Sequence, residues 1–269
     1  MINLLGFLFL RPGLNAVYSE HSFAIYPLAT AAAGGAHRVA KTTDGFAHDL
    51  DAIAALIDAN TRLVFLGNPN NPTGTIYRRA EWKRFLAQVP EHVVIVADEA
   101  YFEFVRDPEY PDSLDDHDNQ RLIVTLRTFS KIFGLAGIRV GYAIARPDII
   151  QMLHKVRQPF NVTSLAQVAA TAGMDDTAHT ERTLQVNAEG MDYLETEFRR
   201  LGLAFVPSHA NFLLVEVGDS HSIYNSLLRR GVIVRPMNGY GYPRHVRISV
   251  GLPEENRRLV AALGEVMGR

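Results

Sequence analysis

Several features are missing from this sequence, and each absence narrows the range of possible functions. The chain contains no cysteine, which excludes disulfides, thiolate metal ligands and a catalytic thiol, and fits a reducing compartment such as the cytoplasm. No apolar run approaches the roughly 20 residues that a membrane span requires. The 27 Lys and Arg residues nearly balance the 29 Asp and Glu residues, so no overall basic field would track a phosphate backbone. We therefore expect neither a membrane nor a nucleic acid as partner.

Two segments imitate functional signals. The opening MINLLGFLFLRPG has the apolar run of a signal peptide. No basic residue precedes that run and no small-residue cleavage site follows it, so the segment predicts part of a helix. The acid-rich segment 106–120 has the composition of a cation site. Its prolines and the irregular spacing of its acids favour a solvated loop, and no metal site is predicted.

Short β-rich runs alternate with helical patterns over the first two thirds of the chain. With 269 residues, 47% of them apolar, the chain can form one large domain or two smaller ones. The runs are nearly continuous in apolar residues, which is typical of a mostly parallel sheet covered by helices on both faces. One helix is expected at 79–89, where apolar residues share one face. The expected strands are 15–19, 62–66, 93–97, 121–126 and 138–145.

The pattern changes after about residue 160, where long helical segments precede short strands. Helices are expected at 165–176, 180–201 and 253–267, and strands at 211–217, 231–236 and 245–251. This order predicts an α/β large domain over residues 1–165, followed by an interdomain helix and a smaller α+β domain over 166–269. Active groups are expected at the ends of the parallel strands.

Polar residues follow two of the expected strands. The turn GNPNNPTGT, residues 67–75, contains Asn-Pro steps that force an extended backbone, and an ordinary turn is the alternative interpretation. Asp98 leaves a buried strand, and Tyr101 follows it. A buried carboxylate needs a cationic or hydrogen-bonding partner, so Asp98 either caps a turn or holds a protonated ring nitrogen.

A lysine follows the strand expected at 121–126. Lys131 lies among apolar residues, which favour a neutral amine for Schiff-base chemistry, although a surface lysine in a loop is the alternative. Thr128, Ser130 and Arg139 would supply hydroxyls and a guanidinium to an anion. A serine hydrolase using Ser130 and Lys131 is a poor alternative, because nothing nearby supplies an oxyanion hole.

Two arginines in the last third of the chain, Arg235 and Arg247, interrupt or end apolar strands. They suggest anionic substrate groups, with structural ion pairs to glutamates as the alternative. Together the candidate residues supply an amine for an aldehyde, an acid for a ring nitrogen, an amide and a phenol for a ring oxygen, and a cationic phosphate seat. This combination points to pyridoxal phosphate.

The motifs also occur in a known order. NPNNPTG, ADEAYFEF and RTFSKIFGLAGIRVGY are followed by QPFNVTSLAQVAA, ANFLLVEV and VRISVGLPEEN. Over almost the whole chain the sequence resembles the fold-type I, class I/II pyridoxal-phosphate-dependent aminotransferases. Within them it is most similar to the histidinol-phosphate aminotransferases.

The resemblance implies a role for each candidate residue. Lys131 corresponds to the family's Schiff-base lysine and Asp98 to the aspartate at the pyridine nitrogen. Asn71 and Tyr101 correspond to ligands of the ring oxygen, and Phe23 to the aromatic side chain that stacks on the ring. The implied phosphate contacts are Thr128, Ser130 and Arg139, and the implied substrate-binding residues are Arg235 and Arg247.

The resemblance implies transamination by a cytoplasmic homodimer. The amino donor would be histidinol phosphate and the 2-oxo acid 2-oxoglutarate, giving imidazole acetol phosphate and glutamate in histidine biosynthesis. Three alternatives remain open: an aromatic amino acid aminotransferase, a threonine-phosphate-type decarboxylase, and a non-catalytic remnant of the fold.

The family's chains begin upstream of Met1 in this sequence. We therefore expect this stretch to lack the N-terminal arm, the small-residue loop that binds the cofactor phosphate, and a tyrosine that crosses the dimer. Backbone amides at such a loop and helix terminus bind anions strongly. Their loss would weaken cofactor affinity and put turnover in question.

Overall fold

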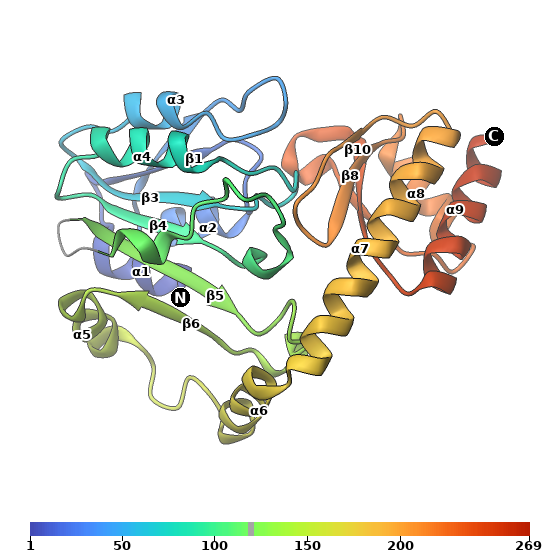
Figure 1. Cartoon of the computed structure of the whole chain (residues 1–269). Helices are drawn as coiled ribbons and strands as arrows, with labels where there is room; N and C mark the ends of the chain where they lie inside the picture. The colour runs from blue at the N-terminus through green and yellow to red at the C-terminus, as the bar shows by residue number, and fades with distance from the viewer. Residues whose placement is uncertain (118–120) are drawn as a thin grey trace.

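A six-stranded sheet organises the first half of the computed structural model, which describes residues 1–117 and 121–269 (Figure 1). The strand order is β2-β1-β3-β4-β5-β6, and every neighbouring pair is parallel except β5 and β6. This confirms the mostly parallel sheet. The strands are β1 (Asn15–Ser19), β2 (Ala36–Ala40), β3 (Thr61–Gly67), β4 (Val94–Asp98), β5 (Leu122–Thr128) and β6 (Gly141–Ala145).

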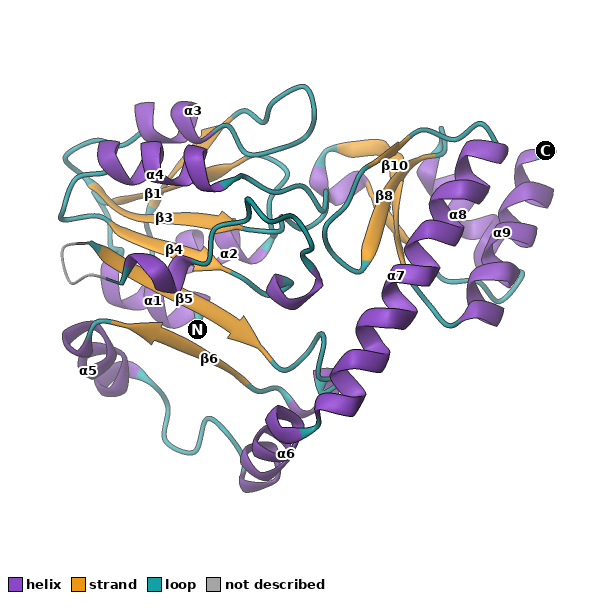
Figure 2. Ribbon diagram, in the orientation of Figure 1, coloured by secondary structure: helices purple, strands orange, loops and turns teal. Residues whose placement is uncertain are grey.

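Helices cover both faces of this sheet (Figure 2). Side chains alternate along β4, so that Val94 and Val96 pack into one apolar cluster while Ile95 packs into the other. The first cluster includes residues of α1, α2 and α5, and the second includes residues of α3 and α4. The helices are α1 (Ile2–Phe9), α2 (Ile25–Ala32), α3 (Leu50–Ala55), α4 (Arg79–Gln88) and α5 (Pro147–Val156).

The apolar stripe predicted at 79–89 forms the buried face of α4. Trp82, Phe85, Leu86 and Val89 are each at most 7% exposed. Trp82 also donates a hydrogen bond from Nε1 to Asp116 at 2.9 Å, which satisfies the indole N–H. The helix expected in the opening segment is likewise present as α1.

A second, antiparallel sheet follows in the order β7-β8-β10-β9. Figure 1 shows α7 running from α6 to the helices that cover this sheet. The predicted division after residue 165 falls within the first turn of α6 and stays a prediction. The elements are α6 (Ser164–Asp175), α7 (Thr177–Arg200), β7 (Phe205–Val206), β8 (Phe212–Glu216), α8 (Ser220–Leu228), β9 (Arg235–Met237), β10 (Tyr242–Ser249) and α9 (Pro253–Met267).

Three sequence predictions need correction. The strand expected at 138–145 begins only at Gly141, because Ala136–Ile138 forms a 3-10 helix and Arg139 has a left-handed backbone. The strand expected at 231–236 is shorter, because only Arg235–Met237 pairs with β10, although Val232 and Val234 are buried. The segment 106–120 is not simply a solvated loop: Tyr110 and Ser113 are buried, and a short 3-10 helix, η2 (Ser113–Asp116), lies within it. Residues 118–120 of that prediction lie outside the described residues.

The described part of the chain contains no helix that is long and apolar enough to cross a membrane. Within the same residues, no group of three or more His, Asp or Glu side chains is placed to hold a metal ion.

Candidate active site

A cavity of about 440 Å³ lies where β3, β4 and β5 end. The last residues of these strands, Gly67, Asp98 and Thr128, all contribute to its lining. Parallel strands bring their carboxyl ends to one edge of the sheet, so residues far apart in the sequence meet there. The predicted site residues that line this cavity are Phe23, Asn71, Asp98, Tyr101, Thr128, Ser130, Lys131 and Arg139.

Asp98 is the acidic group of the cavity. Burial raises the pKa of its carboxyl group, while hydrogen bonds from the Tyr26 hydroxyl and the Ala100 amide and the charge of Lys131 act in the opposite direction. The Tyr26 hydroxyl donates to Asp98 Oδ2 at 2.8 Å. A desolvated carboxylate with a neutral hydroxyl as its hydrogen-bonding side chain is suited to a cationic N–H partner.

Lys131 faces the same cavity from the turn after β5. Its Nζ lies 4.9 Å from the centroid of the Tyr101 ring. Tyr101 is 4% exposed and packs edge-on against Phe212 at a centroid distance of 5.2 Å. The phenol is thereby fixed beside the amine.

Asn71 meets a residue from the second sheet. Arg247 Nη1 donates a hydrogen bond to Asn71 Oδ1, and the guanidinium lies 4.9 Å from the centroid of the Phe212 ring. Because the arginine occupies the amide oxygen, the N–H groups of Asn71 are left to donate to a ligand. Arg247 Nε is buried and has no hydrogen-bond partner among the described residues.

The turn between β5 and β6 carries the expected anion contacts. The Ser130 amide donates to Thr128 Oγ1 at 3.1 Å, which draws the chain into a tight turn. Arg139 is exposed, has a left-handed backbone with φ of 61°, and donates from Nη1 to the Ala136 carbonyl at 2.8 Å. Met1 and Ile2, at the start of α1, also line the cavity.

Arg235 lies outside this cavity. It is exposed on β9 and is paired in register with Arg247 of β10. The structure therefore brings Arg235 beside Arg247, and neither arginine is part of the cavity lining.

Sequence reasoning missed Tyr26. Its ring is 1% exposed and stacks on Phe65 at 4.9 Å. A buried tyrosine needs a partner for its hydroxyl, so its position three residues after Phe23 was a usable signal. The identity of the partner was not, because Asp98 lies 72 positions away.

Comparison with known proteins identifies the family. The family model for aminotransferase class I and II matches residues 1–263, and the chain belongs to this family, as expected. Histidinol-phosphate aminotransferase 2 of Pseudomonas aeruginosa is 48% identical over 268 residues, which cover 99% of this chain and 72% of that protein. Histidinol-phosphate aminotransferase of Akkermansia muciniphila is 46% identical over 267 residues, covering 99% and 73%.

The fold is confirmed by solved structures. Histidinol-phosphate aminotransferase from Sinorhizobium meliloti, crystallised in complex with pyridoxal-5'-phosphate, has a TM-score of 0.91 and 28% identity. The match covers 99% of this chain and 74% of that chain.

Proposed function

We propose that this chain is a pyridoxal-phosphate-dependent aminotransferase that acts on histidinol phosphate. The amino group passes to 2-oxoglutarate, giving imidazole acetol phosphate and glutamate in histidine biosynthesis. Membership of the family and the names of relatives at 46% to 48% identity support this reaction. The observation that carries the proposal is a single cavity in which the Lys131 amine and the desolvated Asp98 carboxylate both lie.

The cavity residues fit the cofactor. Among the described residues, Asp98 accepts a side-chain hydrogen bond from Tyr26 and feels the charges of Lys131 and the Met1 amino group without an ion pair to either, which leaves it able to pair with a ring N–H. Asn71 retains free amide N–H groups for a ring oxygen, and Tyr101 lines the same cavity and offers a hydroxyl. A volume of about 440 Å³ falls within the usual range for small-molecule sites. Pyridoxal phosphate, when bound, supplies an aldehyde that reacts with amines and a ring that takes up electron density.

Each side chain then has a definite task. Lys131 would hold the cofactor through Nζ, and the same nitrogen would remove a proton from the substrate carbon and later return one. Asp98 keeps a proton on the ring nitrogen. Phe23 packs against the ring face, and the turn with Thr128 and Ser130 binds phosphate oxygens.

The three arginines bind anionic groups of the cofactor and the substrate. Arg139 pairs with the cofactor phosphate, since a guanidinium presents several N–H groups to phosphate oxygens. Arg247, whose Nε is unpaired, binds the anionic group of the substrate, and Arg235 beside it adds a further positive charge. A substrate phosphate and a substrate carboxylate would use the same pair.

The test uses cofactor and borohydride. Purified chain is mixed with pyridoxal phosphate, and its visible spectrum is recorded before and after reduction, with Lys131→Ala as the matched variant. We expect a yellow adduct that borohydride fixes to Lys131 and that the variant lacks. An adduct that persists unchanged in Lys131→Ala would refute the site assignment.

A donor screen then identifies the substrate. Histidinol phosphate, phenylalanine and threonine phosphate are compared as donors with 2-oxoglutarate, and both glutamate and carbon dioxide are measured. Glutamate formed fastest from histidinol phosphate supports the proposal. Preferential use of phenylalanine, release of carbon dioxide, or no turnover despite cofactor binding would favour one of the three alternatives.

We also infer a cytoplasmic homodimer, with residues 1–165 as its cofactor domain and 166–269 as interdomain helix and small domain. Large apolar side chains on and before α6 are strongly exposed, including Phe160 at 95%, Leu165 at 78% and Val168 at 69%. Clustered exposure of this kind is typical of an interface. Sedimentation should give a dimer for the chain and a monomer for Val168→Glu, and a monomeric parent chain would contradict the inference.

A further inference from the structure

A buried ion pair lies at the edge of the candidate site, with Arg127 in the cavity lining and Glu99 outside it. Glu99 immediately follows Asp98 at the end of β4, and Arg127 immediately precedes Thr128 at the end of β5. The side chain of Glu99 is 2% exposed and that of Arg127 is 12% exposed. The two partners therefore lie at the ends of adjacent strands, next to the site residues Asp98 and Thr128.

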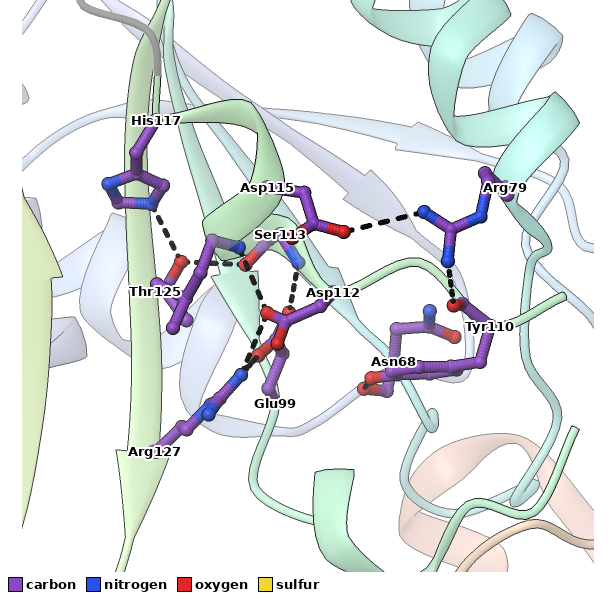
Figure 3. A network of polar contacts seen from close by, with 11 residues as sticks. Asn68, Arg79, Glu99, Tyr110, Asp112, Ser113, Asp115, His117, Thr125 and Arg127 are labelled. Carbon is purple, nitrogen blue, oxygen red and sulfur yellow. Dashed lines mark hydrogen bonds and ion pairs between the residues drawn. The ribbon is translucent and has the colours of Figure 1, made fainter. Parts of the chain in front are cut away.

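The contacts of this pair are extensive (Figure 3). Arg127 donates from Nε and Nη2 to Glu99 Oε2 at 3.0 and 2.8 Å, and from Nη2 to Asp112 Oδ1 at 2.9 Å. Glu99 Oε1 accepts from the Ser113 amide at 3.0 Å. The Arg127 guanidinium also lies 3.8 Å from the centroid of the Phe102 ring. The guanidinium is thus held by two carboxylates and a ring, all on or after β4.

Burial makes each charge of this pair depend on its partner. Burial raises the pKa of Glu99, while the hydrogen bonds from Ser113 and Arg127 and the positive charge of Arg127 act in the opposite direction. A buried charge left without its partner is strongly unfavourable, so the two side chains are held together. Hydrophobic residues of similar size would stabilise a core equally well, which means that stability alone does not explain an ion pair at this place.

The position of the pair in the sheet suggests what it does. In the β4–β5 register Asp98 is opposite Leu126, and the Glu99 amide donates to the Leu126 carbonyl at 2.9 Å. The backbone ladder ends there, and the Glu99–Arg127 ion pair links the next residues. Beyond it β5 turns toward Lys131.

We propose that Glu99 and Arg127 are positioning residues that fix the separation between the Asp98 carboxylate and the turn from Thr128 to Lys131. The proposal rests on the proposed function, since that separation matters only if one cofactor is held at its ring nitrogen by Asp98 and at its phosphate and aldehyde by the turn. Glu99 is not part of the cavity lining, whereas Arg127 is; in this role each acts through the neighbouring backbone.

The experiment compares variants that change the pair in different ways. Arg127→Lys keeps the charge but loses the planar fork, and Glu99→Gln keeps the shape but loses the charge. Asp112→Asn removes one charge at a partly exposed position, with side-chain exposure of 33%, and keeps an oxygen to accept from the Leu114 amide. Leu86→Ala, in α4 and 7% exposed, is the matched control, because it destabilises the same sheet without touching the strand ends.

The measurements are the dissociation constant for pyridoxal phosphate and the pH at which the bound cofactor's visible band changes. We expect Arg127→Lys and Glu99→Gln to weaken binding by about tenfold or more and to move that pH, because positional errors outside the first contacts cost this much. Asp112→Asn should weaken binding by about threefold, on the same reasoning for a less buried contact. Leu86→Ala should lower the melting temperature without changing either quantity.

Binding within twofold of the parent chain and an unmoved pH in both ion-pair variants would overturn the proposal. If those two variants fail to fold, unchanged affinity in Asp112→Asn overturns it. If the parent chain itself gives no borohydride-trapped adduct, the proposed function fails instead, so the two failures are distinct.

Discussion

His48 is a buried base beneath the loop that carries Asn71. It is 3% exposed, its Nε2 lies 2.9 Å from the Gly67 carbonyl oxygen, and its Nδ1 lies 2.7 Å from Ser19 Oγ. A carbonyl only accepts, so Nε2 must carry the proton. Nδ1 of the neutral ring then accepts from the serine hydroxyl. Both nitrogens are satisfied without a positive charge.

This environment makes folding depend on pH. Burial lowers the pKa of His48 from 6.5 to about 4. The unfolded chain takes up a proton here as the pH falls through 6.5, whereas the folded chain does not until about pH 4. The contribution of His48 is therefore complete above pH 6.5 and is lost between 6.5 and about 4. At 1.36 kcal/mol for each pKa unit, the loss is about 3 kcal/mol.

The assay is chemical unfolding at pH 7, 5.5 and 4 for the parent chain and for His48→Gln, which keeps a donor for the Gly67 carbonyl. The difference between the two proteins isolates the histidine. Such isolation is needed because burial raises the pKa of Asp98 and Glu99, which favours folding as the pH falls. We expect the parent chain to lose about 3 kcal/mol more than the variant between pH 7 and 4. Parallel curves for the two proteins would refute the reasoning.

Three further perturbations test other parts of the structure. Tyr26→Phe removes the hydrogen bond to Asp98 at 2.8 Å. It should weaken pyridoxal phosphate binding by about tenfold, because hydrogen bonds to charged groups contribute about 1.5–3 kcal/mol. A titration that gives the affinity of the parent chain would contradict this expectation. Gly74→Ala should destabilise the chain by more than about 1 kcal/mol, because φ is +75° and a Cβ atom would lie 2.0 Å from Ser208 Oγ. In the double variant Gly74→Ala/Ser208→Gly, denaturation should show that the part of the lost stability due to the clash with Ser208 is regained. Equal stability of the single and double variants would show that this clash does not matter. Phe198 of α7 is fully buried against the second sheet, in an apolar cluster with Leu213 and Val246. Phe198→Ala should lower the free energy of unfolding by about 3–5 kcal/mol, and a loss below about 1 kcal/mol would mean that this cluster is loosely packed.

The strands of the large sheet were predictable because most of them are buried on both faces. Residues 63–66 and 93–97 are continuous apolar runs, and the structure places β3 and β4 over them. The edge strand β2 was missed because Ala36–Ala40 is mostly exposed and carries polar residues among the apolar ones. An edge strand pairs on one side only, so its sequence is less constrained.

A residue of the candidate site was predictable where its side chain has a characteristic reactivity and where it follows an expected strand. Lys131 and Asp98 met both conditions. Tyr26 and the Glu99–Arg127 pair did not, because their importance lies in partners from other strands, which no local pattern reveals. The burial of Tyr110 was hidden in the same way by its acidic neighbours.

The hydrogen bond between Arg247 and Asn71 joins β10 of the second sheet to the loop that follows β3 of the first. On the proposed function, the same guanidinium also engages an incoming anion through Nε, which has no partner among the described residues. A guanidinium has five N–H donors, so it can hold the Asn71 amide and the anion together. Arrival of the substrate would then alter the charge felt by the Asn71 amide and by the ring beside it. The electronic state of the bound ring would therefore report whether the neighbouring anion subsite is filled.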